Sequence, residues 1–238
     1  MNTIIASHPH AAKGYAGSDT RHDTPRSGLA VQRIAPGSLL FSEGDDAQDV
    51  FEIVSGTLRL YKVLIDGRRQ IIGFVSGGQL LGLAPRQQYV CTAEAVTPLT
   101  VRRYLRPAFE RRIDEEPGLA RRLLDALSNE LRVAQDQMVL LGRKSAPEKV
   151  ASFLMSLAAD ENGDHEDHVD LPMGRGDIAD YLGLTVETVS RTFTKLKNDG
   201  LIALPSPASV EILDLDQLEA LATGCADDDA WSRSGGSW

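Results

Sequence analysis

Cysteine is scarce in this chain of 238 residues, which contains only Cys91 and Cys225. Two cysteines are too few for a disulfide framework, so a small secreted fold held together by disulfides is excluded. The chain also lacks any long apolar run, which excludes a transmembrane helix, and its first residues lack the basic and apolar segments of a secretory signal. These absences predict a cytoplasmic protein that has no membrane partner.

The chain lacks an excess of basic residues as well, since its formal net charge is -9 at pH 7. Nucleic-acid-binding domains are usually basic, so the total charge alone argues against this class of partner. The acidic residues are nevertheless concentrated in one loop after residue 159 and around the tail, whereas the segment after Thr185 still carries Arg191, Lys195 and Lys197. We therefore expect DNA binding that is modest in non-specific affinity and strongly dependent on salt.

Short apolar segments separated by glycines extend from Leu29 to Val101 and predict evenly spaced β-strands. Asp66-Gly67 between two of these segments is a signal for a hairpin turn. The pattern is typical of a barrel or a double-sheet jelly roll, and we assign residues 29–115 to such a β-roll. The region from Leu29 to Val101 contains no histidine, so a metal enzyme with imidazole ligands inside the roll is disfavoured.

The remaining sequence patterns do not predict a metal site or an enzyme either. His8, His10 and His22 lie in the polar segment 1–28, which we expect to be a disordered arm without a fixed metal geometry. The run DHEDH at 164–168 is more typical of a solvated loop than of a metal site. A catalytic triad, a P-loop and a paired-carboxylate signature are all absent.

A helix-turn-helix pattern occupies residues 175–200, RGDIADYLGLTVETVSRTFTKLKNDG. Gly183 supplies the positive φ that a sharp turn between helices often needs, and Thr185 can cap the second helix. Small Ala179 lets the two helices approach closely. The apolar residues that we expect to be buried, the last three recurring at spacings of four and three, are Ile178, Ala179, Leu182, Leu184, Val189, Phe193 and Leu196.

The opposite face of the second helix carries polar side chains. At about 100° per residue, Glu187, Ser190, Arg191 and Thr194 point away from the buried stripe. A carboxylate can accept a hydrogen bond from cytosine N4, and a guanidinium can form a bidentate pair with guanine O6 and N7, so we predict a recognition helix that reads bases in the major groove. The alternative is an ordinary solvated ion pair between Glu187 and Arg191, which lie one turn apart. The expected phosphate contacts are Thr185, Thr194 and Lys195.

A heptad pattern occurs in a helix that we predict from Pro117 to about Leu141. Its apolar residues alternate spacings of four and three over three repeats, which is typical of a two-stranded coiled coil. A coiled coil would make a homodimer and place two recognition helices on one face, as half-sites one DNA turn apart require. Packing of the helix against its own domain is the alternative. The apolar seam consists of Ala120, Leu124, Leu127, Leu131, Ala134, Met138 and Leu141.

The dimerisation helix is expected to end in a break or hinge at Gly142 to Lys144, so that residues 116–144 form one segment. A capping box from Ser145 to Glu148 then opens a helix to about Ala159 and begins the DNA-binding domain, residues 145–222.

Alternation within LIALPSPASVEIL after Gly200 predicts a hairpin, which makes the DNA-binding domain winged, and a short strand is expected at 169–171. Asp214 can cap a last helix that ends near Ala222. Residues 223–238 are expected to be a disordered tail. The predicted fold class is α+β: a jelly roll, a long dimerisation helix and a winged helix-turn-helix.

This order of elements resembles the Crp/Fnr superfamily of bacterial transcription regulators over roughly residues 29–222. PGSLLFSEGDDAQDVFEIVSGTLRLYK is similar to the start of the family's cyclic-nucleotide-binding type of roll, and DIADYLGLTVETVSRTFTKL is especially similar to the Fnr and FixK branches. The resemblance implies a homodimer that is not an enzyme. It would bind palindromic double-stranded DNA, recruit RNA polymerase and activate transcription.

The resemblance also implies a target sequence. In the Fnr and FixK branches, the residues that match Val186, Glu187, Ser190 and Arg191 read a TTGAT…ATCAA inverted repeat. The cAMP-responsive branch carries arginine where this chain has Val186, and it reads a TGTGA-type half-site. The chain therefore resembles readers of the TTGAT class.

Members of the resembled family respond to different signals, and the residues that this chain lacks argue against two of them. Iron–sulfur members of the family need four cysteines, which this chain does not have. The cAMP branch holds its cyclic phosphate with an arginine and its ribose with a glutamate, and an approximate alignment places Tyr89 and Leu83 at these positions. Arg86 lies nearby and could bind an anion, but its carboxylate partner is missing. Cys91 is interpreted as a small buried hydrophobe rather than as a sensor.

With these two branches set aside, the chain resembles a FixK-type regulator, which acts without a bound cofactor and is controlled by its abundance or by modification. Such regulators act in low-oxygen respiration and nitrogen fixation, a role that rests on the resemblance alone. The alternative is a sensor-regulator gated by a cyclic nucleotide or another small molecule, and haem stays open among such ligands.

Overall fold

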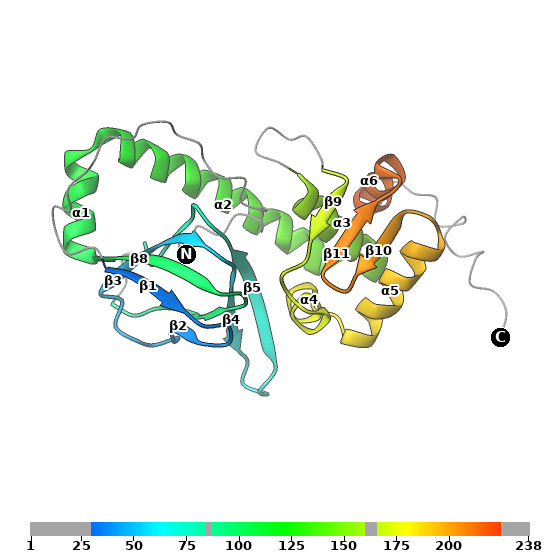
Figure 1. Ribbon diagram of the computed structural model, residues 1–238, viewed down its shortest axis with the longest axis horizontal. Helices are drawn as coiled ribbons and strands as arrows, with labels where there is room; N and C mark the ends of the chain where they lie inside the picture. The colour runs from blue at the N-terminus through cyan, green and yellow to red at the C-terminus, as the bar shows by residue number, and fades with distance from the viewer. Residues whose placement is uncertain (1–29, 84–86, 160–165, 225–238) are drawn as a thin grey trace. The chain divides into compact units, whose positions relative to one another are not determined.

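The computed structural model describes residues 30–83, 87–159 and 166–224, and it divides into two compact units, Met1–Gln135 and Asp136–Trp238. Figure 1 shows the helices and strands of both units. The expected arm over 1–28 and the tail from Cys225 onward lie outside the described residues, as do most of the acidic loop and Arg86.

The first unit contains a double-sheet jelly roll, which confirms the predicted fold class. One antiparallel sheet has the strand order β1-β8-β3-β6, and the other has the order β2-β7-β4-β5. The predicted hairpin turn at Asp66-Gly67 joins β4 to β5, and Gly67 has a φ of 82° there. The strands are β1 (Ala30–Ile34), β2 (Leu39–Phe41), β3 (Asp49–Ser55), β4 (Leu58–Val63), β5 (Arg69–Val75), β6 (Leu80–Leu81), β7 (Thr92–Ala95) and β8 (Leu99–Leu105).

The core of the roll lies between the two sheets. Because side chains alternate between the faces of a strand, every second residue of a strand points inward. On β4, for example, Leu58 and Leu60 are fully buried, whereas Arg59 between them is only half-buried. The buried cluster also contains Phe41, Phe51, Ile53, Val75, Leu81, Tyr89, Cys91, Ala93, Leu99 and Val101.

Two helices, α1 (Arg106–Glu115) and α2 (Pro117–Arg143), follow the roll. The sequence predicted α2 but not α1, which has a proline in its first turn and ends at Glu115, with Glu116 as its C-cap. A second buried cluster attaches both helices to strands β3 and β8. It consists of Val50, Tyr104, Phe109, Leu119 and Leu123.

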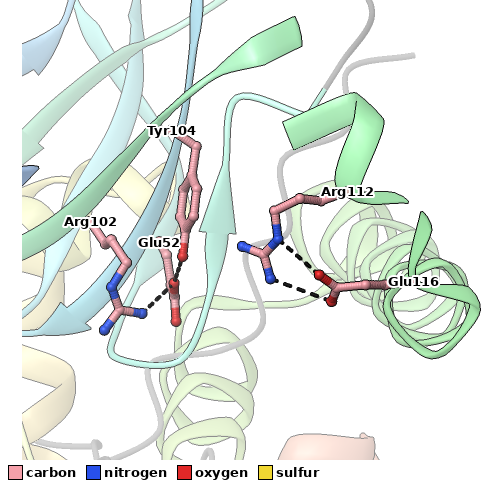
Figure 2. A network of polar contacts seen from close by, with 5 residues as sticks. All are labelled: Glu52, Arg102, Tyr104, Arg112 and Glu116. Atoms are coloured by element: carbon pink, nitrogen blue, oxygen red, sulfur yellow. Dashed lines mark hydrogen bonds and ion pairs between the residues drawn. The ribbon is translucent and has the colours of Figure 1, made fainter. Parts of the chain in front are cut away.

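Polar contacts fix the bend between α1 and α2 to the same strands (Figure 2). Glu52 on β3 accepts hydrogen bonds from the Tyr104 hydroxyl at 2.5 Å and from Arg102 at 2.7 Å. The Arg112 guanidinium of α1 lies 5.6 Å from the centre of the Tyr104 ring and pairs with Glu116, the residue between the two helices. Burial, and then the hydrogen bond to Glu52, raise the pKa of Tyr104.

The second unit is a winged helix-turn-helix, in which a three-stranded sheet has the order β10-β11-β9. The predicted capping box opens its first helix, because the Ser145 backbone N–H donates to the Glu148 carboxylate at 2.6 Å. The expected Asp214 cap is present, since its side chain accepts from the Gln217 N–H. The elements are α3 (Ala146–Ala158), β9 (His168–Asp170), α4 (Arg175–Leu182), α5 (Val186–Asn198), β10 (Ile202–Ser206), β11 (Ser209–Ile212) and α6 (Leu215–Thr223).

The structure differs from the expected break at Gly142 to Lys144, because α2 continues as a helix through Gly142 to Arg143. Contacts within the second unit hold these last turns. Leu140 is buried, and the Gln137 side chain donates a hydrogen bond to the Tyr181 carbonyl at 3.1 Å. A glycine inside a helix costs only about 1 kcal/mol relative to alanine, which such contacts offset.

None of the helices in the described ranges combines the length and the apolar character that crossing a bilayer requires.

Candidate nucleic-acid interface

The turn between α4 and α5 has the geometry that the sequence predicts. Gly183 has a φ of 64°, in the left-handed region that favours glycine. Thr185 is the N-cap of α5, and its hydroxyl oxygen accepts a hydrogen bond from the Thr188 N–H at 3.1 Å. Gly183 therefore ends α4, and the Thr185 cap two residues later begins α5.

The expected stripe of α5 is buried. Val189, Phe193 and Leu196 are at most 1% exposed and pack into the second unit with Ile178 and Leu182 of α4. Thr192 is also buried, which the sequence did not predict, and its hydroxyl donates to the Thr188 carbonyl. This hydrogen bond satisfies the polar group, so a threonine can lie on the apolar face.

The four predicted base-reading residues all lie exposed on α5. Val186 is 50% exposed, and Ser190 is exposed one turn further along the helix. Arg191 and Glu187 form the ion pair expected from their spacing, at 2.5 Å, with side chains that are 79% and 71% exposed. An exposed pair of this kind is worth at most about 1 kcal/mol, so Arg191 can exchange its partner for a guanine at little cost.

The three candidate phosphate contacts differ in how much of their hydrogen-bonding capacity is already used. The Thr194 hydroxyl donates to the Ser190 carbonyl, so it must release this bond before it can donate to a phosphate. The Thr185 hydroxyl lies 2.8 Å from that of Thr188, and both are exposed enough to turn toward a ligand. Lys195 is half-buried on the same helix.

Arg175 is a cation near the start of the helix-turn-helix that the sequence-based interpretation missed. It is the first residue of α4, and its guanidinium lies 3.6 Å from the centre of the Phe193 ring of α5. Burial lowers its pKa, and among the described residues its buried Nη1 has no hydrogen-bond partner. A cation at a helix N-terminus opposes the helix dipole, and this mismatch was the available sequence signal. A cation at the first turn of a helix, beside its N–H groups, is a candidate contact for an anion.

Lys149 of α3 forms a hydrogen bond to the end of α4, next to the turn. It is 8% exposed, and its ammonium donates to the Leu182 carbonyl, the last of α4, at 3.2 Å. The residue that follows this carbonyl is Gly183, so the contact holds the end of α4 where the chain bends. A lysine in a predicted helix carries no sequence signal for this role, because the contact joins residues that are 33 positions apart in the chain.

The wing formed by β10 and β11 carries hydroxyl groups rather than cations at its tip. Ser206 and Ser209 share a hydrogen bond of 2.8 Å between their side-chain oxygens, and both lie near the bend of the hairpin. Hydroxyl groups can donate to phosphate oxygens without adding charge.

The apolar seam expected on α2 is only partly exposed. Leu124, Leu131 and Met138 are 64%, 47% and 65% exposed, respectively, and they are spaced by seven residues. Ala134 is exposed as well, and Leu141 is 38% exposed. Leu127 instead packs partly against the buried cluster of Tyr104 and Phe109. A helix that is apolar on two faces packs one against its own unit and leaves the other open.

Residues that the resemblance relates to ligand binding lie in the roll. Tyr89 is 8% exposed, and Leu83 packs against the cluster beneath α1 and α2. Cys91 is 2% exposed, as expected for a small buried hydrophobe, and burial raises the pKa of its thiol to about 12. Such a thiol stays protonated and is a poor nucleophile or metal ligand.

Possible metal ligands do not cluster in the part of the chain that the structure describes, where no three histidine, cysteine or carboxylate side chains come together. His168 is exposed and lies 3.4 Å from the Asp170 carboxylate, an ordinary surface pair.

Comparison with protein families supports both halves of this architecture. Residues 148–221 match the Crp-like helix-turn-helix domain, and residues 31–116 match the cyclic nucleotide-binding domain.

Individual proteins that are similar to the chain are regulators of transcription. The transcriptional activatory protein AadR of Rhodopseudomonas palustris is 48% identical over 194 residues, which is 80% of each chain. The nitrogen fixation regulation protein FixK of Bradyrhizobium diazoefficiens is 46% identical over 79% of this chain and 80% of its own. The solved structure of FixK2 from Bradyrhizobium japonicum superposes with a TM-score of 0.74 at 35% identity, covering 82% of this chain and 98% of that one.

Proposed function

Because the chain belongs to the Crp/Fnr superfamily of DNA-binding transcription regulators and is not an enzyme, we propose that it is a homodimeric activator that reads a TTGAT…ATCAA-type inverted repeat. It does so without an obligatory small-molecule cofactor. The observation that carries the proposal is the exposed face of α5, where Glu187 and Arg191 form a pair that DNA bases can replace.

The chemistry of this face supports a specific assignment of contacts. Arg191 reads a guanine through O6 and N7, and Glu187 accepts from a cytosine N4. Ser190 contacts a neighbouring base, and the apolar Val186 meets a thymine methyl group. The phosphates around the site are contacted by Thr185, Thr194 and Lys195, to which we add Arg175 because its stacked guanidinium, at the start of α4, has an Nη1 that is unbonded among the described residues.

The exposed seam of α2 supports the homodimer. Leu124, Leu131 and Met138 present apolar side chains to solvent at a spacing of seven residues, which two parallel helices can bury against each other. A two-fold axis along this seam gives two copies of α5 related by symmetry, as an inverted repeat requires. Half-sites about 34–36 Å apart then meet one recognition helix each.

The biological role follows from the relatives. By name, AadR is a transcriptional activatory protein and FixK is a nitrogen fixation regulation protein. The chain accordingly controls genes of low-oxygen respiration or nitrogen fixation in the cytoplasm, where it recruits RNA polymerase through an exposed surface.

Fluorescence anisotropy at fixed salt, without added ligand, tests the proposal. The probes are a TTGAT…ATCAA duplex, a TGTGA-type palindrome and a scrambled duplex. Tight and selective binding to the first is the expected result, with a specificity ratio of about 10³ or more over the scrambled duplex. Selective binding only after cAMP is added would favour the ligand-gated alternative, and a preference for the TGTGA site would contradict the assignment of Val186.

A further inference from the structure

The roll matches a family that binds cyclic nucleotides, so its interior can be tested for a fit to such a ligand. A ligand of this kind needs a cavity and an uncommitted cation for its phosphate. The position that the phosphate-binding arginine would occupy is held by Tyr89, which is 8% exposed and belongs to the buried cluster between the sheets.

The Tyr89 side chain fills this part of the roll. Its ring stacks on that of Phe41, with centroids 3.9 Å apart and planes inclined by 15°. Its hydroxyl donates a hydrogen bond to the Asp49 carbonyl of β3 at 2.9 Å. Burial raises the pKa of the phenol to about 12, so the group stays neutral and keeps this donor at physiological pH.

The two arginines close to Tyr89 are already engaged by the protein. Arg103 pairs with the Asp49 carboxylate at 2.6 Å, and Arg106 donates to the carbonyls of Ala47 at 2.7 Å and Gly82 at 2.5 Å. The second carboxylate oxygen of Asp49 is buried and has no hydrogen-bond partner among the described residues. An anionic phosphate would therefore approach the buried, unbonded oxygen of Asp49, while the two arginines near it already have partners, so the described residues of the roll do not fit a cyclic nucleotide.

The same contacts lead from Tyr89 to the helices. Gly82 lies against both Tyr89 and Asp49, since a Cβ on it would be 3.3 Å from the Tyr89 ring and 2.7 Å from the Asp49 carbonyl. Arg106, the first residue of α1, binds the Gly82 carbonyl, and its backbone N–H donates to Gln48 at 2.8 Å. The position of Tyr89 is thus connected by direct contacts to the start of α1, which continues through the bend at Glu116 into α2.

We propose that Tyr89 takes the place of a diffusible effector: this side chain completes the core of the roll and holds α1 in its place, so that DNA binding needs no ligand. The inference rests on the proposed function, because it explains how a roll of this family supports ligand-independent DNA binding. It predicts that removing the ring converts the protein into one that a small phenol activates.

The test uses the full-length Tyr89→Ala variant with p-cresol, which has the shape of the missing side chain. Removal of the ring leaves an apolar cavity next to Phe41, and apolar cavities of this size bind small aromatic compounds. The expected result is a loss of about tenfold or more in affinity for the inverted repeat, which p-cresol restores in a saturable manner. Thermal unfolding of the variant should show stabilisation by p-cresol in the same concentration range.

Two further variants complete the design. Val101→Ala opens a cavity in the same core that is too small for a ring, so it should lose stability without any response to p-cresol. Tyr89→Phe keeps the stacked ring but removes the hydrogen bond to Asp49, and it should bind DNA several-fold more weakly than the wild type while p-cresol has no effect. Where Tyr89→Ala does not fold, the DNA affinity of Tyr89→Phe tests the inference.

The outcomes separate this inference from the proposed function. If Tyr89→Ala, or Tyr89→Phe where the former does not fold, binds DNA as tightly as the wild type, Tyr89 is only a packing residue and the inference fails, although the proposed function stands. Binding of cAMP to the wild type in calorimetry, with a gain in DNA affinity, would also overturn it. Absence of selective DNA binding by the wild type would instead contradict the proposed function itself.

Discussion

Arg191 and Glu187 are the exposed charged pair on which the proposed reading of bases depends. They are one turn apart on the exposed face of α5, at 2.5 Å from each other. In water the pair contributes little to stability, because solvent screens it. We expect the pair to keep the guanidinium near the surface of the helix, where a guanine can replace the carboxylate as its partner.

We predict that Arg191→Ala weakens binding to the inverted repeat by about 1–3 kcal/mol per half-site and relaxes discrimination at the guanine that it reads. The measurement is anisotropy with the TTGAT…ATCAA probe and with variants at that base pair. Lys197→Ala, an exposed cation on the same helix, is the matched control and should retain the discrimination. Equal losses on specific and scrambled DNA would contradict a base-reading role for Arg191.

Arg175 makes a different prediction because it is a cation without an assigned base. Arg175→Gln should weaken binding to specific and scrambled DNA by a similar factor and reduce the slope of log K against log salt by about 1 per half-site. Salt titrations of the anisotropy signal measure both quantities. Arg175→Lys cannot reproduce the planar stacking on Phe193. Because it keeps the positive charge, it should nevertheless retain most of the salt slope. An unchanged slope in Arg175→Gln would exclude a phosphate contact.

At the scale of elements, α2 combines two kinds of apolar face. Leu119 and Leu123 are buried with Tyr104 and Phe109 of the first unit. Leu124 and Leu131 point the other way and remain exposed. The heptad pattern by itself did not distinguish these faces. Packing against the same domain describes the buried face, and the exposed face is the one that the proposed coiled coil would use.

We expect Leu131→Glu to convert the dimer to a monomer, because it places two carboxylates opposite each other in the seam. Sedimentation equilibrium measures the mass, and the loss of a second recognition helix should reduce DNA affinity by about 10²-fold or more. Val139→Glu changes an apolar residue that is 56% exposed but lies outside the seam, so it should leave the dimer intact. Dissociation by both variants, or by neither, would argue against a coiled coil along Leu124, Leu131 and Met138.

At the scale of the whole molecule, buried acidic groups with raised pKa values make the stability of both units fall at alkaline pH. Burial raises the pKa of Cys91 from 9.0 and that of Tyr89 from 10.0, each to about 12, in the first unit. Burial has the same effect on Tyr181 in the second unit, where the pKa is also raised to about 12. The folded protein therefore binds these protons more tightly than the unfolded chain does.

The expected result is a stability that is fully present below about pH 9 and falls as the pH rises through 9 to 12, since the unfolded chain releases these protons first. Urea unfolding at a series of pH values, followed by circular dichroism, measures the free energy of unfolding. Tyr89→Phe removes one of these groups and should make this decline less steep. A stability that is independent of pH up to 11 would show that these groups are solvated in the folded protein.

Local rules accounted for much of the fold. Periodicities of two and of three to four residues separate strands from helices, and they placed the jelly roll, α2 and the buried stripe of Val189, Phe193 and Leu196. Capping residues located the starts of α3, α5 and α6, because a cap acts within three residues of itself. The helix α1 escaped prediction because its ten residues are mostly charged and contain a single buried residue, Phe109.

The sequence by itself therefore determined the order of the elements other than α1, the class of protein and the exposed residues of α5, since each depends on neighbours within a few positions along the chain. Only the tertiary structure decided what depends on distant pairs: the stacking of Arg175 on Phe193, the support of Leu182 by Lys149 and the place of Tyr89 between Phe41 and Asp49. It also showed that Gly142 lies within a helix, where packing of the last turns outweighs the weak propensity of one glycine. Such contacts arise from how whole elements pack together, and no local pattern in the chain encodes them.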